Sequence, residues 1–150
     1  MEDKKYELLK DDYKEVYGIK LYRIRALKDF GDVKKGHVGG YIEKEENLSQ
    51  INNCWVDGEA KVYGKAEVCG EAEIKSLQDY IVFKNNWSSG RSFTWTRSND
   101  MWKVGCFYGT GKELIEKAYE DSKLSGDMYK MYVEFVEKIK ERLKEEENDG

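Results

Sequence analysis

His37 is the only histidine in the chain, and histidine is the side chain best suited to accept and release a proton near neutral pH. A positioned histidine can act as the general base when an acyltransferase removes a proton from an acceptor hydroxyl or amine. His37 lies in the glycine-rich segment 29–42, and no carboxylate accompanies it at a telling spacing. The sequence therefore offers one candidate base for acyl transfer, and a solvated loop histidine is the alternative interpretation.

A basic segment follows a predicted tight turn near the N-terminus. Apolar and basic residues alternate over residues 21–27, which is typical of a half-buried strand. Arg23 and Arg25 would share its exposed face, with Lys20 and Lys28 on either side. Two interpretations stay open. The face is either an anion-binding strip or a solvated strand surface that pairs with the many acidic residues of the chain.

Residues 105–112 lie between a predicted strand and a predicted helix and are similar to a phosphate-binding P-loop. The segment has one residue too many, and Glu113 stands where Ser or Thr would hold magnesium. These differences exclude NTP hydrolysis. The free backbone N–H groups of the helix start, near Lys112, could still bind an anion.

Aromatic and basic residues close to this segment predict a nucleotide site, in which a base stacks on tryptophan and arginine holds a phosphate. The residues are Trp87, Arg91, Trp95, Arg97 and Trp102, together with Lys112. The alternative is that the tryptophans belong to a core or an interface, because aromatic side chains supply much of the burial in small sheets.

A six-residue repeat organises the middle of the chain. Its three series are Cys54, Ala60, Ala66 and Ala72, then Val56, Val62, Val68 and Ile74, and finally Gly58, Gly64 and Gly70. Because side chains alternate along a strand, the small and aliphatic residues would face one interior, and each glycine would mark a bend. Weaker hexads at Ile42 and Leu48, in step with Cys54, extend the repeat to about two coils of a parallel β-helix.

So few coils cannot stand alone, and their open ends must be covered by the rest of the chain, by another copy or by a partner. On the outer face, Trp55 and Tyr63 are apolar enough to predict a contact, either with the C-terminal part or with a second copy. We therefore expect a homo-oligomer.

Composition limits the class of protein. With 26 Lys and Arg against 30 Asp and Glu, the net charge is −4, and no basic face suited to duplex nucleic acid is expected. The three cysteines lack the spacing of a disulfide framework or a zinc site, which fits a cytoplasmic protein. No apolar run approaches membrane-spanning length. We expect neither a cofactor nor a metal.

The pattern changes after Ile74. Strands are predicted at residues 80–84, 92–97 and 101–108, and Thr110 with Glu113 has the spacing of a capping box that begins a helix. A last helix begins after residues 125–127, and its acidic end at 145–150 is expected to fray. Its apolar stripe, expected to cover the sheet, contains Met128, Met131, Tyr132, Phe135, Val136, Ile139 and Leu143.

These segments predict a mostly β chain with a C-terminal α+β part. Residues 1–36 would form an N-terminal β-hairpin cap, and residues 37–75 a short left-handed parallel β-helix of about two coils. Residues 79–147 would form a three-stranded antiparallel sheet covered by two helices.

A resemblance to a known group rests on two stretches of the chain. These are L-Y-R-I-R-A-L-K-D-F-G-D-V-K-K-G-H-V-G-G-Y-I-E-K-E-E-N-L-S and W-V-D-G-E-A-K-V-Y-G-K-A. They resemble the N-terminal part of hexapeptide-repeat proteins of bacteriophages and prophages, over about the first half of the chain. The resemblance implies a left-handed parallel β-helix and no catalytic residues, because that group has no established common activity.

The function predicted on this basis is that of a non-enzymatic phage accessory protein. It would counter host defence, either by inhibiting a host immune protein or by sequestering a small anionic signalling nucleotide. Two alternatives stay open: a reduced hexapeptide acyltransferase that uses His37, and a structural module whose coils stack on one another.

Overall fold

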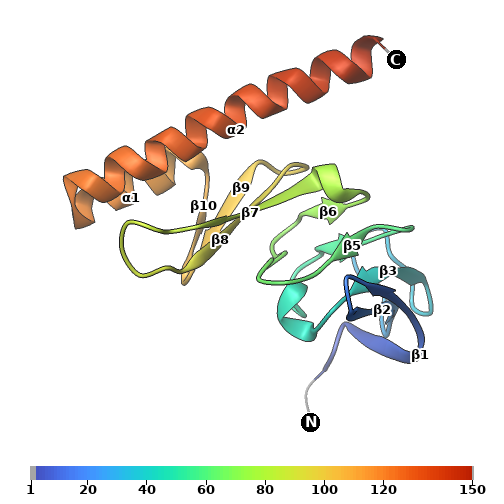
Figure 1. Cartoon of the computed structure of the whole chain (residues 1–150). Helices are drawn as coiled ribbons and strands as arrows, with labels where there is room; N and C mark the ends of the chain where they lie inside the picture. Colours follow the sequence, from blue (N-terminus) through green and yellow to red (C-terminus); the bar gives the residue numbers. More distant parts are fainter. Residues whose placement is uncertain (1–2, 150) are drawn as a thin grey trace.

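The computed structural model describes residues 3–149, which build two regions lying side by side (Figure 1). The first contains β1 (Tyr6–Val16), β2 (Ile19–Ala26), β3 (Val38–Ile42), β4 (Trp55–Val56), β5 (Lys61–Val62) and β6 (Glu73–Ile74), with the 3-10 helices η1 (Glu45–Asn47) and η2 (Leu77–Asp79). The second contains β7 (Tyr80–Lys84), β8 (Ser92–Thr96), β9 (Met101–Val104), β10 (Phe107–Gly109), α1 (Gly111–Asp121) and α2 (Lys123–Asp149). The prediction of a β-rich chain that ends in two helices is confirmed.

Each region has its own cluster of buried apolar side chains. One cluster joins the hairpin to the repeat, and the other joins the C-terminal sheet to its helices. The division into residues 1–36, 37–75 and 79–147 stays a prediction. The hairpin and the repeat share one core, because Tyr6 and Ile24 are buried in the same cluster as Val56 and Val62.

The repeat region makes two stacked turns of chain with parallel pairing on three sides. Ile42 pairs with Val62, Leu48 with Val68, and Val56 with Ile74. The predicted register of the upstream hexads is therefore wrong by two residues, since Ile42 and Leu48 align with the aliphatic series and not with Cys54. The left-handed twist of a β-helix stays a prediction.

Glycines occupy the bends between the short strands, as the repeat predicts. Gly58, Gly64 and Gly70 all have positive φ, at 59°, 69° and 65°, a region that other residues avoid. Around Gly58 and Gly64 the space is open to 4 Å, so at these two bends the backbone conformation, and not close packing, requires glycine.

The N-terminal hairpin covers the first coil. β2 pairs antiparallel with β3 and so extends one side of the coil. The Tyr6 hydroxyl donates to the Leu48 carbonyl at 2.6 Å, and the buried Lys5 ammonium donates to the Cys54 carbonyl at 2.7 Å. β1 runs continuously through the polar segment 10–12 by way of a register shift between Leu9 and Tyr13.

Side chains of the C-terminal sheet and of its β8–β9 turn cover the second coil. The Glu67 N–H donates to Thr94 Oγ1 at 3.0 Å, and the Glu73 N–H donates to Ser98 Oγ at 2.8 Å. The Tyr80 hydroxyl donates to the carbonyl of Lys61 at 2.9 Å. Within residues 3–149, both ends of the two-coil stack therefore meet side chains of the same chain, while stacking of coils between copies stays a prediction.

The C-terminal sheet has four strands in the order β10-β9-β8-β7, not three. The chain turns at Gly105, whose φ is 56°, and this splits the predicted strand 101–108 into β9 and β10. The predicted capping box begins α1: the Glu113 N–H donates to Thr110 Oγ1 at 3.2 Å, and the Thr110 N–H to Glu113 Oε1 at 2.8 Å.

The long helix α2 covers the sheet with most of the predicted stripe, since Val136 is buried and Tyr132 packs against the same cluster, but two members of the stripe lie outside the contact. Tyr129 and Val136 are buried, whereas Met131 and Phe135, which were expected to be covered, are 55% and 52% exposed. The segment predicted to fray is helical as far as Asp149, and Gly150 lies outside the described residues. Within residues 3–149, no helix is both long and apolar enough to span a membrane.

Candidate functional site

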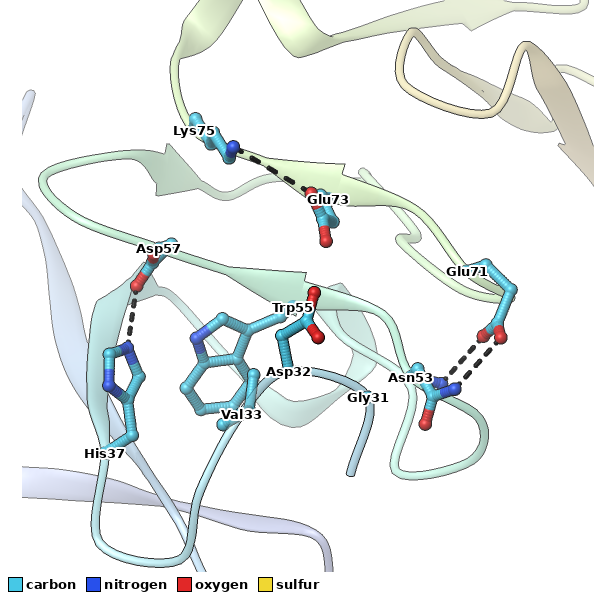
Figure 2. A pocket seen from close by; sticks show the side chains of 10 residues that line it. All are labelled: Gly31, Asp32, Val33, His37, Asn53, Trp55, Asp57, Glu71, Glu73 and Lys75. Carbon is cyan, nitrogen blue, oxygen red and sulfur yellow. Dashed lines mark hydrogen bonds and ion pairs between the residues drawn. The ribbon is translucent and has the colours of Figure 1, made fainter. Parts of the chain in front are cut away.

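The imidazole of His37 and the carboxylate of Asp57 meet at a cavity on the side of the coils (Figure 2). His37 Nε2 lies 3.0 Å from Asp57 Oδ1, and both side chains are 45% exposed. The cavity has a volume of about 410 Å³. It is lined by segment 31–37 and by residues on and next to β4 and β6. An exposed imidazole held by a carboxylate is the arrangement that a general base requires.

Segments on either side of β3 and β4 position this pair. His37 immediately precedes β3, and Asp57 immediately follows β4. The two strands approach so closely that a side chain at Gly39 would collide with Trp55, at 2.6 Å from a ring carbon. Glycine at this position therefore lets the Trp55 indole lie across β3 and brings the two functional segments together.

Trp55 forms the floor of the cavity between His37 and Val33 (Figure 2). Its ring is only 4% exposed and packs against Phe30 at 5.3 Å between ring centroids and against His37 at 6.1 Å. The indole Nε1 is buried and has no hydrogen-bond partner among residues 3–149. Buried donors without a partner are rare in folded proteins, and the Asp57 carboxylate is the acceptor on which this indole has an electrostatic effect.

The lining of the cavity is mainly acidic. Four carboxylates, those of Asp32, Asp57, Glu71 and Glu73, face one lysine, Lys75. Glu71 is held by the Asn53 side chain at 3.0 Å, and Lys75 lies 3.9 Å from Glu73. The resulting potential favours a cationic ligand over an anionic one.

The pKa of Asp57 is lower than its usual value. Burial alone would raise the pKa, but the hydrogen bond with His37 and the Gly58 backbone N–H outweigh burial. The nearby Trp55 indole acts in the same direction, although no hydrogen bond of good geometry joins its Nε1 to the carboxylate. Asp57 is therefore ionised at neutral pH and can hold the imidazole in one orientation.

The basic strand face is occupied by acidic and carbonyl partners. Arg23 donates to Glu59 at 3.0 Å and to the Gly39 carbonyl at 2.9 Å, and its guanidinium also stacks on Tyr41, 4.4 Å from the ring centroid. Arg25 donates to Glu7 at 2.5 Å. These contacts match the interpretation of a paired strand surface, while binding of an anion there stays a prediction.

The predicted nucleotide residues do not meet at one place. Trp95 is fully buried in the C-terminal core, and its Nε1 donates to Asp100 at 2.8 Å. Trp102 is buried in the same cluster. Trp87 packs against this cluster, and its Nε1 donates to Ser125 Oγ at 3.2 Å. Arg91 and Arg97 lie at opposite ends of β8, and Arg97 pairs with Glu147 at 2.5 Å.

The two remaining predicted residues also lie apart from each other. Lys112 is exposed at the start of α1, and Tyr63 is half-buried between β5 and the next bend. Among residues 3–149, no group of three or more His, Cys, Asp or Glu side chains is placed to hold a metal ion.

Asp57 is the candidate-site residue that the sequence did not predict. His37 has no carboxylate at a telling short spacing, because its partner lies 20 residues away. The pairings of Ile42 with Val62 and of Leu48 with Val68 show that one coil on these sides also takes 20 residues. A search at the length of one coil would have found the pair.

Comparisons with known proteins relate part of the chain to an enzyme. No family model matches the chain. Over 55 residues the chain is 42% identical to a protein of Escherichia coli (strain K12) whose name is "Uncharacterized acetyltransferase YdcK". The match covers 36% of this chain, which spans only 17% of the length of that curated relative.

This relative overturns the predicted function. A non-enzymatic phage accessory protein that counters host defence is wrong as the main interpretation, because the matching protein is named as an acetyltransferase. The same finding contradicts the prediction that the chain is not an enzyme, and it favours the acyltransferase alternative. The match supports a relationship to hexapeptide-repeat proteins of the acyltransferase type. It does not support a phage origin. A homo-oligomer stays a prediction.

Proposed function

We propose that this chain takes part in acyl transfer, with His37 as the general base of the cavity. The observation that carries the proposal is the 3.0 Å contact between His37 Nε2 and Asp57 Oδ1 beside an unpaired indole N–H. The partial identity to a protein named as an acetyltransferase supports the same chemistry.

In this proposal, each of three side chains has a role. Asp57 accepts the Nε2–H hydrogen bond, which leaves the lone pair of His37 on Nδ1. Nδ1 removes a proton from the acceptor as the acceptor attacks the carbonyl carbon of an acyl thioester. The carbon–sulfur bond then breaks, and the thiolate takes up the proton. The Trp55 N–H is a donor for an oxygen of the bound substrates.

The acidic lining indicates an amine as the acceptor. Carboxylates outnumber cations around His37, and a cationic ammonium group is attracted to such a surface. The bound ammonium first loses one proton to water, and His37 removes the second proton as the neutral amine attacks. A neutral hydroxyl compound gains less from this field. The proposal therefore predicts faster acyl transfer to an amine than to the matching alcohol.

Release of thiol from acetyl-coenzyme A tests the proposal, with glucosamine and spermidine as amines and glucose as the matched hydroxyl compound. We expect release with an amine, and a rate about 10²- to 10⁴-fold lower for His37→Gln. Asp11→Asn is the control, because Asp11 is exposed on β1, away from the cavity. Equal rates for the wild type and His37→Gln would refute the role of His37.

A further inference from the structure

A second cavity lies in the C-terminal region, between the loop that joins β7 to β8 and the two helices. Its volume is about 360 Å³, within the range of small-molecule sites. None of its lining residues lines the His37 cavity. Figure 1 shows this loop reaching toward the end of the molecule where α1 and α2 meet.

Asn85 gives this cavity a buried hydrogen-bond acceptor that is not used. The residue is only 8% exposed, and its Nδ2 donates to the Tyr129 hydroxyl at 3.4 Å. Its Oδ1 is buried and has no partner within residues 3–149. Since buried amide oxygens in folded proteins nearly always accept a hydrogen bond, this atom indicates a ligand with an N–H or O–H donor.

Unpaired charges of both signs surround the same cavity. Arg91 and Lys117 supply positive charge, and Asp121 supplies negative charge. The Arg91 guanidinium lies against Gly105, where a side chain would collide with it. No ion pair or side-chain hydrogen bond is present for these three groups within the described part of the chain. They are free to bind a ligand that itself carries both charges.

The remaining wall of the cavity is apolar. Leu114 and Ala118 are buried on α1, and Val104 and Phe107 lie at the β9–β10 turn. A polar ligand alone would leave this wall in contact with water. The wall instead fits an aliphatic or aromatic group, whose burial would add to the binding free energy.

We propose that this cavity binds a free α-amino acid with an apolar side chain. Arg91 and Lys117 bind the α-carboxylate, and Asn85 Oδ1 and Asp121 accept hydrogen bonds from the α-ammonium group. The apolar wall receives the side chain. This site is independent of acyl transfer at His37, so either proposal can fail without the other.

Calorimetric titration with L-leucine and L-phenylalanine tests the ligand class. We expect at least one to bind with a Kd of about 1 mM or below. N-acetyl-L-leucine lacks the ammonium group and L-leucinamide lacks the carboxylate, and each is expected to bind about tenfold more weakly than L-leucine. Absence of binding by both amino acids, or equal binding by the two modified compounds, would overturn the proposal.

Matched variants and a thiol reaction test the location. Arg91→Gln is expected to weaken binding about tenfold, and Arg142→Gln, on the exposed part of α2, to leave it unchanged. Cys106 is exposed at the cavity, whereas Cys54 is buried and Cys69 half-buried. Bound L-leucine should therefore slow the alkylation of Cys106 by iodoacetamide. Unchanged binding in Arg91→Gln, or an unchanged alkylation rate, would place any bound amino acid elsewhere.

Discussion

His37 and Asp57 come from segments that lie one coil apart, and neither residue alone distinguishes a catalytic site from a solvated surface. We base the proposal that the cavity binds an amine and removes its proton on their contact at 3.0 Å, the unpaired Trp55 indole and the acidic lining. The His37 and Asp57 side chains are partly exposed, so their ion pair contributes little to the free energy of unfolding.

Replacing Asp57 by Asn tests the positioning of the imidazole. We expect the rate of acyl transfer to fall at least about tenfold, but less than in His37→Gln, because the base is still present without its carboxylate partner. Chemical denaturation at neutral pH should show a change of only about 1 kcal/mol or less. A rate equal to that of the wild type would show that Asp57 does not orient His37.

Lys5 is a second residue with an unusual setting, since its ammonium group is buried under the hairpin against the Cys54 carbonyl. Burial lowers the pKa of Lys5, and the nearby Cys54 thiol only partly opposes this. The folded protein therefore binds the proton less tightly than the unfolded chain does. Protonated Lys5 therefore makes folding less favourable. The free energy of unfolding increases as pH rises from the lowered pKa of Lys5 in the folded protein to its pKa in the unfolded chain.

Urea denaturation between about pH 7 and pH 10 tests this assignment. The stability of the wild type, measured relative to Lys5→Met, is expected to increase with pH over part of this range. Lys84→Met is the control, because Lys84 is exposed on β7. The difference in free energy of unfolding between the wild type and Lys84→Met should stay constant with pH. A flat difference for Lys5→Met as well would contradict the lowered pKa.

At the scale of the elements, the glycine bends set the path of the coils. Gly64 has a φ of 69° with open space around the position of a Cβ atom. Gly64→Ala should lower the free energy of unfolding by about 1 to 2 kcal/mol through backbone strain. Gly64→Asn should cost less, because Asn tolerates this conformation better. Denaturation curves that rank the two variants in the opposite order would show that packing limits this bend.

The sequence predicts the repeating elements well, because each carries its own signal. The small, aliphatic and glycine series predict the short strands and bends, and Thr110 with Glu113 predicts the start of α1. The eight-residue interval from Leu48 to Val56 breaks the hexad, so the upstream register could not be read by counting sixes. The sequence also did not predict that Phe135 is exposed. Periodicity gives the width of an apolar stripe on a helix, but it does not say which edge of that stripe the sheet covers.

At the scale of the whole molecule, two unrelated regions stabilise a stack of only two coils. The hairpin supplies a strand, a hydroxyl and an ammonium group to one end, and the C-terminal sheet supplies hydroxyl groups to the other. The need for covered ends was predictable from the number of repeats. Which side chains cover them was not, because these contacts join residues up to 49 positions apart.

Thr94 tests this coupling of the two regions. Its side chain is 1% exposed and accepts the Glu67 N–H, so Thr94→Val should leave that donor unpaired and lower the free energy of unfolding by about 1 to 3 kcal/mol. Hydrogen exchange should show lost protection at Glu67. Thr96→Val is the control, because the Thr96 hydroxyl donates to Asn99 in the turn between β8 and β9, and it should leave the Glu67 amide protected.

Mass spectrometry of the acceptor is the most direct test of the central claim, that the His37 cavity transfers acyl groups. Glucosamine is incubated with acetyl-coenzyme A and either the wild-type chain or His37→Gln, and the acetylated product is measured. The account predicts product with the wild type and about 10²- to 10⁴-fold less with His37→Gln. Equal amounts of product from the two proteins would contradict it.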